Sequence, residues 1–214
     1  MIDLQNVGKI YHANGKKVAA LDDLSLHIEK GEFVVVRGPS GSGKTTLLLT
    51  IGAMLKPDSG EVAVAGENIY SLKGGERAKF RAANIGFVFQ MFHLLPYLTV
   101  WENIMVPALK NQKSEAHEIL EDLGLAERAH HKPFALSAGE RQRTAVARAL
   151  INHPKVILAD EPTGNLDPEN AADVIDHLAA FHANGGTVVV VTHGEQADHY
   201  ATRVIRMREG KIDA

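Results

Sequence analysis

The chain contains no cysteine among its 214 residues, so disulfide frameworks and thiolate chemistry are excluded. Long apolar segments are also missing: no run approaches the ~18–20 residues that a membrane-spanning helix requires. The first residues, Met-Ile-Asp-Leu-Gln-Asn, have neither the basic nor the apolar region of a signal peptide. We therefore expect any role at a membrane to depend on a separate partner.

Neither sign of charge is in large excess, because 23 lysines and arginines accompany 26 aspartates and glutamates, for a net charge of −3. Nucleic-acid-binding domains usually show a basic surface, so we expect no nucleic-acid partner. Internal repeats and low-complexity linkers are missing as well. The hydrophobic content of 45% is ordinary for a globular protein, and the length allows one or two domains with a sizeable core.

One segment dominates what is present. Residues 38–45, Gly-Pro-Ser-Gly-Ser-Gly-Lys-Thr, match the phosphate-binding pattern G-x-x-x-x-G-K-[ST], between a predicted strand (33–37) and a predicted helix (46–55). Such a turn leaves the first N–H groups of the helix free to bind a polyphosphate, and the helix dipole favours its negative charge. Lys44 can reach the β- and γ-phosphate oxygens, and the Thr45 hydroxyl is placed for Mg²⁺. The residues expected to contact the nucleotide here are Gly38, Ser40, Gly41, Ser42, Gly43, Lys44, Thr45 and Thr46.

Hydrophobic periodicity predicts an α/β fold. Continuous Val/Ile/Leu runs that alternate with helices favour a mostly parallel sheet covered on both faces, and the mainly helical stretch 93–153 favours a second lobe. Asn14-Gly15 predicts a turn between the first two strands. The predicted strands cover residues 2–11, 19–28, 33–37, 61–66, 85–90, 155–160, 187–192 and 203–207. Besides the helix at 46–55, the predicted helices cover residues 99–108, 115–123, 137–152 and 169–184.

Polar side chains follow three of these strands. Asp160 and Glu161 end an apolar strand, where Asp160 fits the Mg²⁺-holding acid of a P-loop NTPase and Glu161 fits a general base, although a solvated strand end would look the same. His193 follows four valines and either senses the γ-phosphate or is an ordinary surface histidine. Gln90 either places its amide oxygen on Mg²⁺ or the attacking water, or caps its strand.

Two further sites depend on weaker signals. Ser137-Ala-Gly-Glu140 is a capping-box match at the start of a helix, and capping alone explains Ser137 and Glu140. It does not explain the small pair Ala138 and Gly139, which would admit a second phosphate contact. Tyr11, at a strand end, either stacks on a nucleobase or packs against the protein.

Together these residues resemble the ATPase subunit of ABC transporters over essentially the whole chain. Residues 38–45 are similar to the Walker A loop, Gln90 to the Q-loop glutamine, and Tyr11 to the adenine-stacking aromatic. Residues 136–140 are similar to the signature motif, 157–161 to Walker B with its catalytic glutamate, and 165–167 (Asn-Leu-Asp) to the D-loop, while His193 is similar to the switch histidine.

The signature segment departs from the usual LSGGQ at two positions. Ala138 adds a methyl group where close approach to phosphate is expected, which places signature affinity in doubt. Glu140 is familiar in one branch of the family. Residues 89–96 and 160–167 resemble that branch, which contains lipoprotein-release, macrolide-exporter-type and division-associated ATPases.

The resemblance implies a P-loop NTPase with a RecA-like core (31–60, 71–92 and 154–214), an antiparallel β subdomain (1–30 and 61–70) and a helical signature subdomain (93–153). It implies ATP and Mg²⁺ as cofactors, with Glu161, His193 and Lys44 as catalytic residues and Thr45, Gln90 and Asp160 at the metal. Ser137, Ala138, Gly139, Glu140 and Asp167 are expected to reach the nucleotide from a second copy, in a head-to-tail homodimer.

The resemblance also implies an integral membrane, permease-like partner, with this chain at the cytoplasmic face of the cell membrane. The surface around residues 90–96 is the expected contact, unless its apolar side chains are lobe core. Export, lipoprotein extraction and force transmission in a division complex all stay open. Two rival classes are a soluble ABC-type ATPase acting on nucleic acid and a scaffold that binds ATP without hydrolysing it. The missing coiled-coil inserts and the presence of Glu161 with His193 disfavour both rivals.

Overall fold

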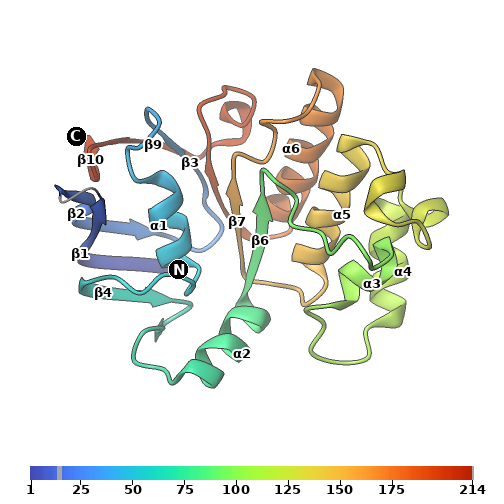
Figure 1. Cartoon of the computed structure of the whole chain (residues 1–214), viewed down its shortest axis with the longest axis horizontal. Coiled ribbons are helices and arrows are strands. Elements are labelled where there is room, and N and C mark those ends of the chain that lie inside the picture. Colours follow the sequence, from blue (N-terminus) through green and yellow to red (C-terminus); the bar gives the residue numbers. More distant parts are fainter. Residues whose placement is uncertain (14–15, 214) are drawn as a thin grey trace.

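The computed structural model describes residues 1–13 and 16–213 and arranges their strands in two sheets with helices around them (Figure 1). The turn predicted at Asn14-Gly15 lies outside the described residues. None of the helices within the described residues combines the length and hydrophobicity that crossing a bilayer requires.

The larger sheet has six strands in the order β10-β9-β3-β8-β7-β6. Neighbours from β9 to β6 run parallel, and β10 pairs antiparallel with β9 at the edge. The valine and isoleucine runs form the central strands because both faces of these strands are buried. The strands are β3 (Phe33–Arg37), β6 (Ile85–Phe89), β7 (Val156–Asp160), β8 (Thr187–Val191), β9 (Arg203–Arg208) and β10 (Lys211–Asp213).

Register aligns the carboxyl ends of the parallel strands. Phe89 pairs with Asp160, Asp160 with Val191, and Val36 with Val191. The segments that follow β3, β6, β7 and β8 therefore leave the sheet along the same edge, which is where open α/β sheets bind ligands.

The smaller sheet is antiparallel, with the order β2-β1-β4-β5. Alternation along β2 buries Leu21, Leu24, Leu26 and Ile28 as predicted, and this face packs with α1 (Lys44–Ile51) and the larger sheet in one core. The strands are β1 (Ile2–Ala13), β2 (Lys16–Ile28), β4 (Ser59–Val64) and β5 (Glu67–Asn68).

Helices α3, α4, α5 and α6 pack in a second core on the opposite face of the larger sheet, whereas Phe80 of α2 packs against the first core. Figure 1 shows α1 and α5 on opposite sides of β7. Thr99 and Ser137 each cap a helix with a complete capping box, as predicted for Ser137. The helices are α2 (Gly74–Asn84), α3 (Val100–Met105), α4 (Lys113–Asp122), α5 (Ala138–Leu150) and α6 (Pro168–Ala183), with short 3₁₀ helices η1 (Ala126–Arg128), η2 (Pro133–Ala135) and η3 (Asp198–Tyr200).

Several predicted bounds were wrong. The helix expected to reach residue 55 ends at Ile51, where the Tyr70 hydroxyl donates to the Thr50 carbonyl (2.7 Å) and Ala53 takes a φ of 57°. The helix expected at 99–108 ends at Met105, before Pro107. Helix α2 was missed because none of its residues is buried and its sequence lacks an apolar stripe. The subdomain boundaries given above stay a prediction.

Candidate functional site

The phosphate-loop residues connect β3 to α1 with no side-chain cap on the helix. Gly43, at the N-cap position, takes a φ of 101°. A Cβ there would lie 2.1 Å from the carbonyl oxygen of Ala20 in β2. The loop is thus pressed against the smaller sheet in a conformation that favours glycine. The first N–H groups of α1 therefore have neither an intrahelical partner nor a side-chain cap.

Lys44 begins α1 and is almost fully buried. Its ammonium group donates to the carbonyl oxygens of Gly38 (2.7 Å) and Pro39 (3.1 Å), so the positive charge lies inside the curve of the loop. A buried cation surrounded by free N–H groups is a site for a polyanion.

A cavity of about 630 Å³ lies over this loop. It is lined by residues from five segments far apart in the sequence: the loop itself, Tyr11 and Val18 from the smaller sheet, and Gln90, Glu161 and His193 from the carboxyl edge of the larger one. The structure therefore brings together most of the residues predicted to bind nucleotide. From the phosphate loop, the lining includes Gly38, Pro39, Ser40, Gly41, Ser42, Gly43, Lys44, Thr45 and Thr46.

The Thr45 hydroxyl donates to Asp160 Oδ1 at 3.2 Å, which joins the start of α1 to the end of β7. Burial raises the pKa of Asp160, and the neighbouring Glu161 charge adds to this, while the Thr45 hydrogen bond and Lys44 oppose it. A carboxylate that burial pushes toward protonation is stabilised by a nearby cation. The hydroxyl and the carboxylate are both hard oxygen donors, which fit a hard divalent ion.

Glu161 and His193 are in direct contact at the ends of β7 and β8. Glu161 Oε1 lies 2.9 Å from His193 Nδ1, and the backbone N–H of His193 is directed toward Glu161 Oε2 at 3.4 Å. Glu161 itself has a φ of 44°, and its backbone N–H donates to the carbonyl of Val191 (2.9 Å). The His193 side chain is 75% exposed, whereas that of Glu161 is 17% exposed. The pair thus presents a carboxylate, held by an imidazole, to the cavity.

Sequence reasoning gave no positioning role to three side chains that hold the loops of this site. Arg37, the last residue of β3, donates from Nη2 to the Gly194 carbonyl and to Asp198 Oδ1, both at 2.7 Å. Arg148 of α5 donates to the carbonyl of Phe92 (2.7 Å), and Asn165 donates to the carbonyl of Gln90 (3.1 Å). The one local signal was Arg37 itself, a charged residue that ends a run of buried valines.

The remaining predicted residues lie elsewhere, at the first turns of α5 and α6. Ser137 Oγ accepts from the N–H of Glu140 (3.1 Å), and Asp167 caps α6 by accepting from the N–H of Asn170 (3.0 Å). These two helix starts are in contact, because a Cβ on Gly139 would overlap the Asn170 side chain. None of Ser137, Ala138, Gly139, Glu140 and Asp167 lines the phosphate-loop cavity of its own chain.

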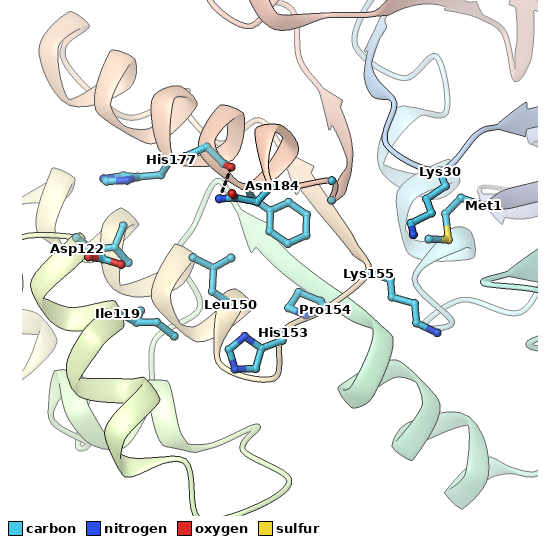
Figure 2. Close-up of a pocket in the computed structure, with 15 residues that line it drawn as sticks. Met1, Lys30, Ile119, Asp122, Leu150, His153, Pro154, Lys155, His177 and Asn184 are labelled. Carbon is cyan, nitrogen blue, oxygen red and sulfur yellow. Dashed lines mark hydrogen bonds between the residues drawn. The ribbon is translucent and has the colours of Figure 1, made fainter.

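A second cavity, of about 530 Å³, lies where β7 and β8 begin, at the edge of the sheet opposite the phosphate loop (Figure 2). Phe181, Leu150 and Ile119 line it together with His177 and Lys155. It contains none of the residues predicted to bind nucleotide. Burial lowers the pKa of His177, with the charge of Arg143 in the same direction.

Comparison with known proteins identifies the family. A model of the family described as "ABC transporter" matches residues 21–164. The chain belongs to the ABC transporter family. The match spans the phosphate loop, the signature segment and the end of β7, which are three of the segments on which the resemblance rested.

Relatives match over nearly all of this ABC cassette. An uncharacterised ABC transporter ATP-binding protein of Methanocaldococcus jannaschii, MJ1508, is 42% identical over 99% of this chain and 97% of its own length. A macrolide export ATP-binding/permease protein, MacB, of Bdellovibrio bacteriovorus is 43% identical over the full chain, which covers 34% of that relative. The chain thus spans about a third of the MacB relative and almost all of MJ1508.

Solved structures agree with the cassette fold. The ATP-binding cassette MJ0796, in a dimeric post-hydrolysis state bound to ADP and Pi, superposes with a TM-score of 0.93 at 40% identity, covering 100% of this chain and 97% of that one. A nucleotide-free cassette of an ABC transporter superposes with a TM-score of 0.86 at 27% identity, covering 100% and 90%. The predicted fold class, a P-loop NTPase with a mostly parallel sheet, is therefore confirmed.

Proposed function

We propose that this cassette hydrolyses ATP at the 630 Å³ cavity and drives a separate membrane protein. The observation that carries the proposal is the convergence of the phosphate loop, the Thr45–Asp160 contact and the Glu161–His193 pair on this one cavity. The cavity supplies a polyanion site, a hard-cation site and a base, which are the three requirements of phosphoryl transfer to water.

In this proposal the loop N–H groups and Lys44 hold the β- and γ-phosphates, and Tyr11, 42% exposed at the mouth of the cavity, stacks on the adenine. Thr45, Asp160 and the Gln90 amide oxygen would hold Mg²⁺, which would supply positive charge to neutralise the phosphates. These three groups are all hard oxygen donors, the kind of ligand that Mg²⁺ prefers.

Hydrolysis then depends on the Glu161–His193 pair. Glu161 accepts the proton of the attacking water, the new bond forms to the γ-phosphorus, and the bond to the β–γ bridging oxygen breaks to release ADP. His193 orients the carboxylate through the 2.9 Å contact. The proton on Glu161 passes to the departing phosphate.

A second copy of the chain completes the site. The Ser137–Gly139 corner does not line the cavity of its own chain, so it is available to cover the γ-phosphate held by the other copy. Its capped helix start presents N–H donors to an anion. The dimer of MJ0796 with ADP and Pi, at 40% identity, supports this arrangement.

The membrane partner is expected at the surface that follows β6. Met91 and Tyr97 are two-thirds exposed there, and Met54 and Val106 border an adjacent groove of about 380 Å³. Exposed apolar groups around a groove are typical of a protein-docking site. The MacB relatives contain an ATP-binding part and a permease in one chain, which supports a permease-like partner and a place at the cytoplasmic face of the membrane.

The variant Glu161→Gln tests the proposal. We expect this variant to bind ATP and to release phosphate ~10²–10⁴-fold more slowly, as the loss of a general base should. Light scattering should show it as a dimer with ATP and Mg²⁺, and as a monomer with ADP. The exposed Glu118→Gln on α4 is the matched control and should keep wild-type turnover. Wild-type turnover in Glu161→Gln would remove Glu161 from the role of base.

A further inference from the structure

The start of α5 presents a negative charge where the proposed function requires an anion to dock. Glu140 occupies the third helical position, and its Oε2 accepts from the Ser137 N–H at 2.7 Å. A carboxylate within one helical turn of Ser137 and Gly139 would repel a γ-phosphate that approaches them. The charge is not needed for the cap itself, because a glutamine can make the same capping-box contact.

Arg128 pairs with this carboxylate. Arg128 Nε donates to Glu140 Oε1 at 2.7 Å, so both carboxylate oxygens of Glu140 have a donor. The pair lowers the pKa of Glu140 and raises the pKa of Arg128, mainly through the hydrogen bond between them. Glu140 therefore keeps its charge, with the neutralising cation in contact.

Arg128 is held in position from another element. It ends the 3₁₀ helix η1, where its backbone N–H donates to the Leu125 carbonyl at 2.9 Å, and Leu125 is fully buried in the second core. Within the described residues, Arg128 is the one basic side chain within ion-pair distance of Glu140.

The arginines of α5 itself are engaged elsewhere. Arg141 lies over the ring of Phe92, and Arg143 contacts Asn170 and Asp173 on α6. Arg148 donates to the carbonyl of Phe92. None of them replaces Arg128 in the described structure.

We propose that Arg128 is a positioning residue that neutralises Glu140, so that the Ser137–Gly139 corner accepts the γ-phosphate held by a second copy. The inference rests on the proposed function, since it concerns the same shared site. Arg128 acts through Glu140: its Nε contact aims the guanidinium at the carboxylate, and its role ends where that charge is removed. Coulomb's law in a wet, salt-screened interface gives an effect on the order of tenfold for one charge about a helical turn from a phosphate.

A double-mutant cycle tests the proposal in the Glu161→Gln background, which is used here to slow hydrolysis. The measurement is the dissociation constant of the ATP–Mg²⁺ dimer by sedimentation velocity. Arg128→Met should raise this constant about tenfold. Adding Glu140→Gln should restore it to within about twofold, because the charge that Arg128 neutralises is then gone. Glu140→Gln alone should lower the constant, because the positive charge of Arg128 then faces the phosphate unopposed.

Three controls separate charge neutralisation from a structural role. Arg128→Lys keeps the charge, so its dimer dissociation constant should lie between those of the parent and Arg128→Met. It replaces Arg128→Met in the cycle if urea unfolding shows that Arg128→Met is unstable. Arg208→Met, an exposed arginine on β9, should leave the dimer unchanged. Binding of ATP to the monomer, measured by calorimetry, should be equal in all variants.

The refuting outcomes differ from one another. An unchanged dimer constant in Arg128→Met overturns the inference and leaves the proposed function standing. Weakening that Glu140→Gln does not restore also overturns it, because Arg128 would then only hold η1 against α5. A parent that stays monomeric with ATP and Mg²⁺ contradicts the proposed function and this inference together.

Discussion

Two glycines of the phosphate loop allow backbone strain to be separated from steric contact. Gly41 and Gly43 both have positive φ, 77° and 101°. A Cβ on Gly41 would meet nothing within 4 Å, whereas a Cβ on Gly43 would lie 2.1 Å from the carbonyl oxygen of Ala20. Gly41→Ala should thus lower the free energy of unfolding only by the strain of a left-handed alanine, about 1–2 kcal/mol. Gly43→Ala should add the cost of overpacking, about 1–3 kcal/mol.

Urea unfolding of the two alanine variants measures this difference. We expect Gly43→Ala to lose about 2–5 kcal/mol of the free energy of unfolding, a large part of the 5–15 kcal/mol typical of a domain. Gly43→Ala should also weaken ATP binding more than Gly41→Ala, because relief of the clash moves the start of α1 away from β2. Equal losses of stability in the two variants would refute the steric argument and leave strain alone as the cause.

Three further changes probe the site and its surroundings. Lys44→Ala should weaken ATP binding about 10- to 100-fold through loss of charge-assisted contacts to phosphate, and unchanged affinity in a calorimetric titration would contradict its role. Arg37→Met should lower kcat while leaving the Kd for ATP unchanged, because the Gly194 and Asp198 contacts that hold the His193 segment are lost; an unchanged kcat would show that this segment holds itself. Burial lowers the pKa of His177 below its ordinary value of 6.5, so the unfolded chain takes up the proton first and stability falls as the pH drops below 6.5. His177→Gln should reduce the change in the urea midpoint between pH 7.5 and 5.5. An equally steep pH dependence in this variant would exclude His177 as its source.

The sequence predicted the local features of this cassette well. The strand from Phe33 to Arg37, the loop that follows it and the capping box at Ser137 were all placed correctly, because each depends on contacts within a few residues. The mostly parallel pairing of the central strands, although not their order, followed from their apolar runs. Helix α2 and the bounds of α1 could not be obtained in this way, because α2 buries no residue and the end of α1 is fixed by Tyr70 from another segment.

For the candidate site, the sequence supplied the chemical groups and the structure decided which of them meet. The sequence indicated Glu161 and His193 separately, but the 2.9 Å contact between them depends on β7 and β8 being neighbours in the sheet. The separation of the Ser137 corner from the phosphate loop likewise follows from helices packed on opposite faces of that sheet.

The amino-acid order thus determined by itself the elements governed by short-range backbone chemistry: a glycine loop that can curve around phosphates, helix caps and buried strands. Tertiary structure alone decided the pairings of side chains that are distant in sequence, such as Arg37 with Gly194 and Arg128 with Glu140. The physical reason is that a charged side chain of this length reaches several partners, and the partner it contacts depends on how the segments pack together.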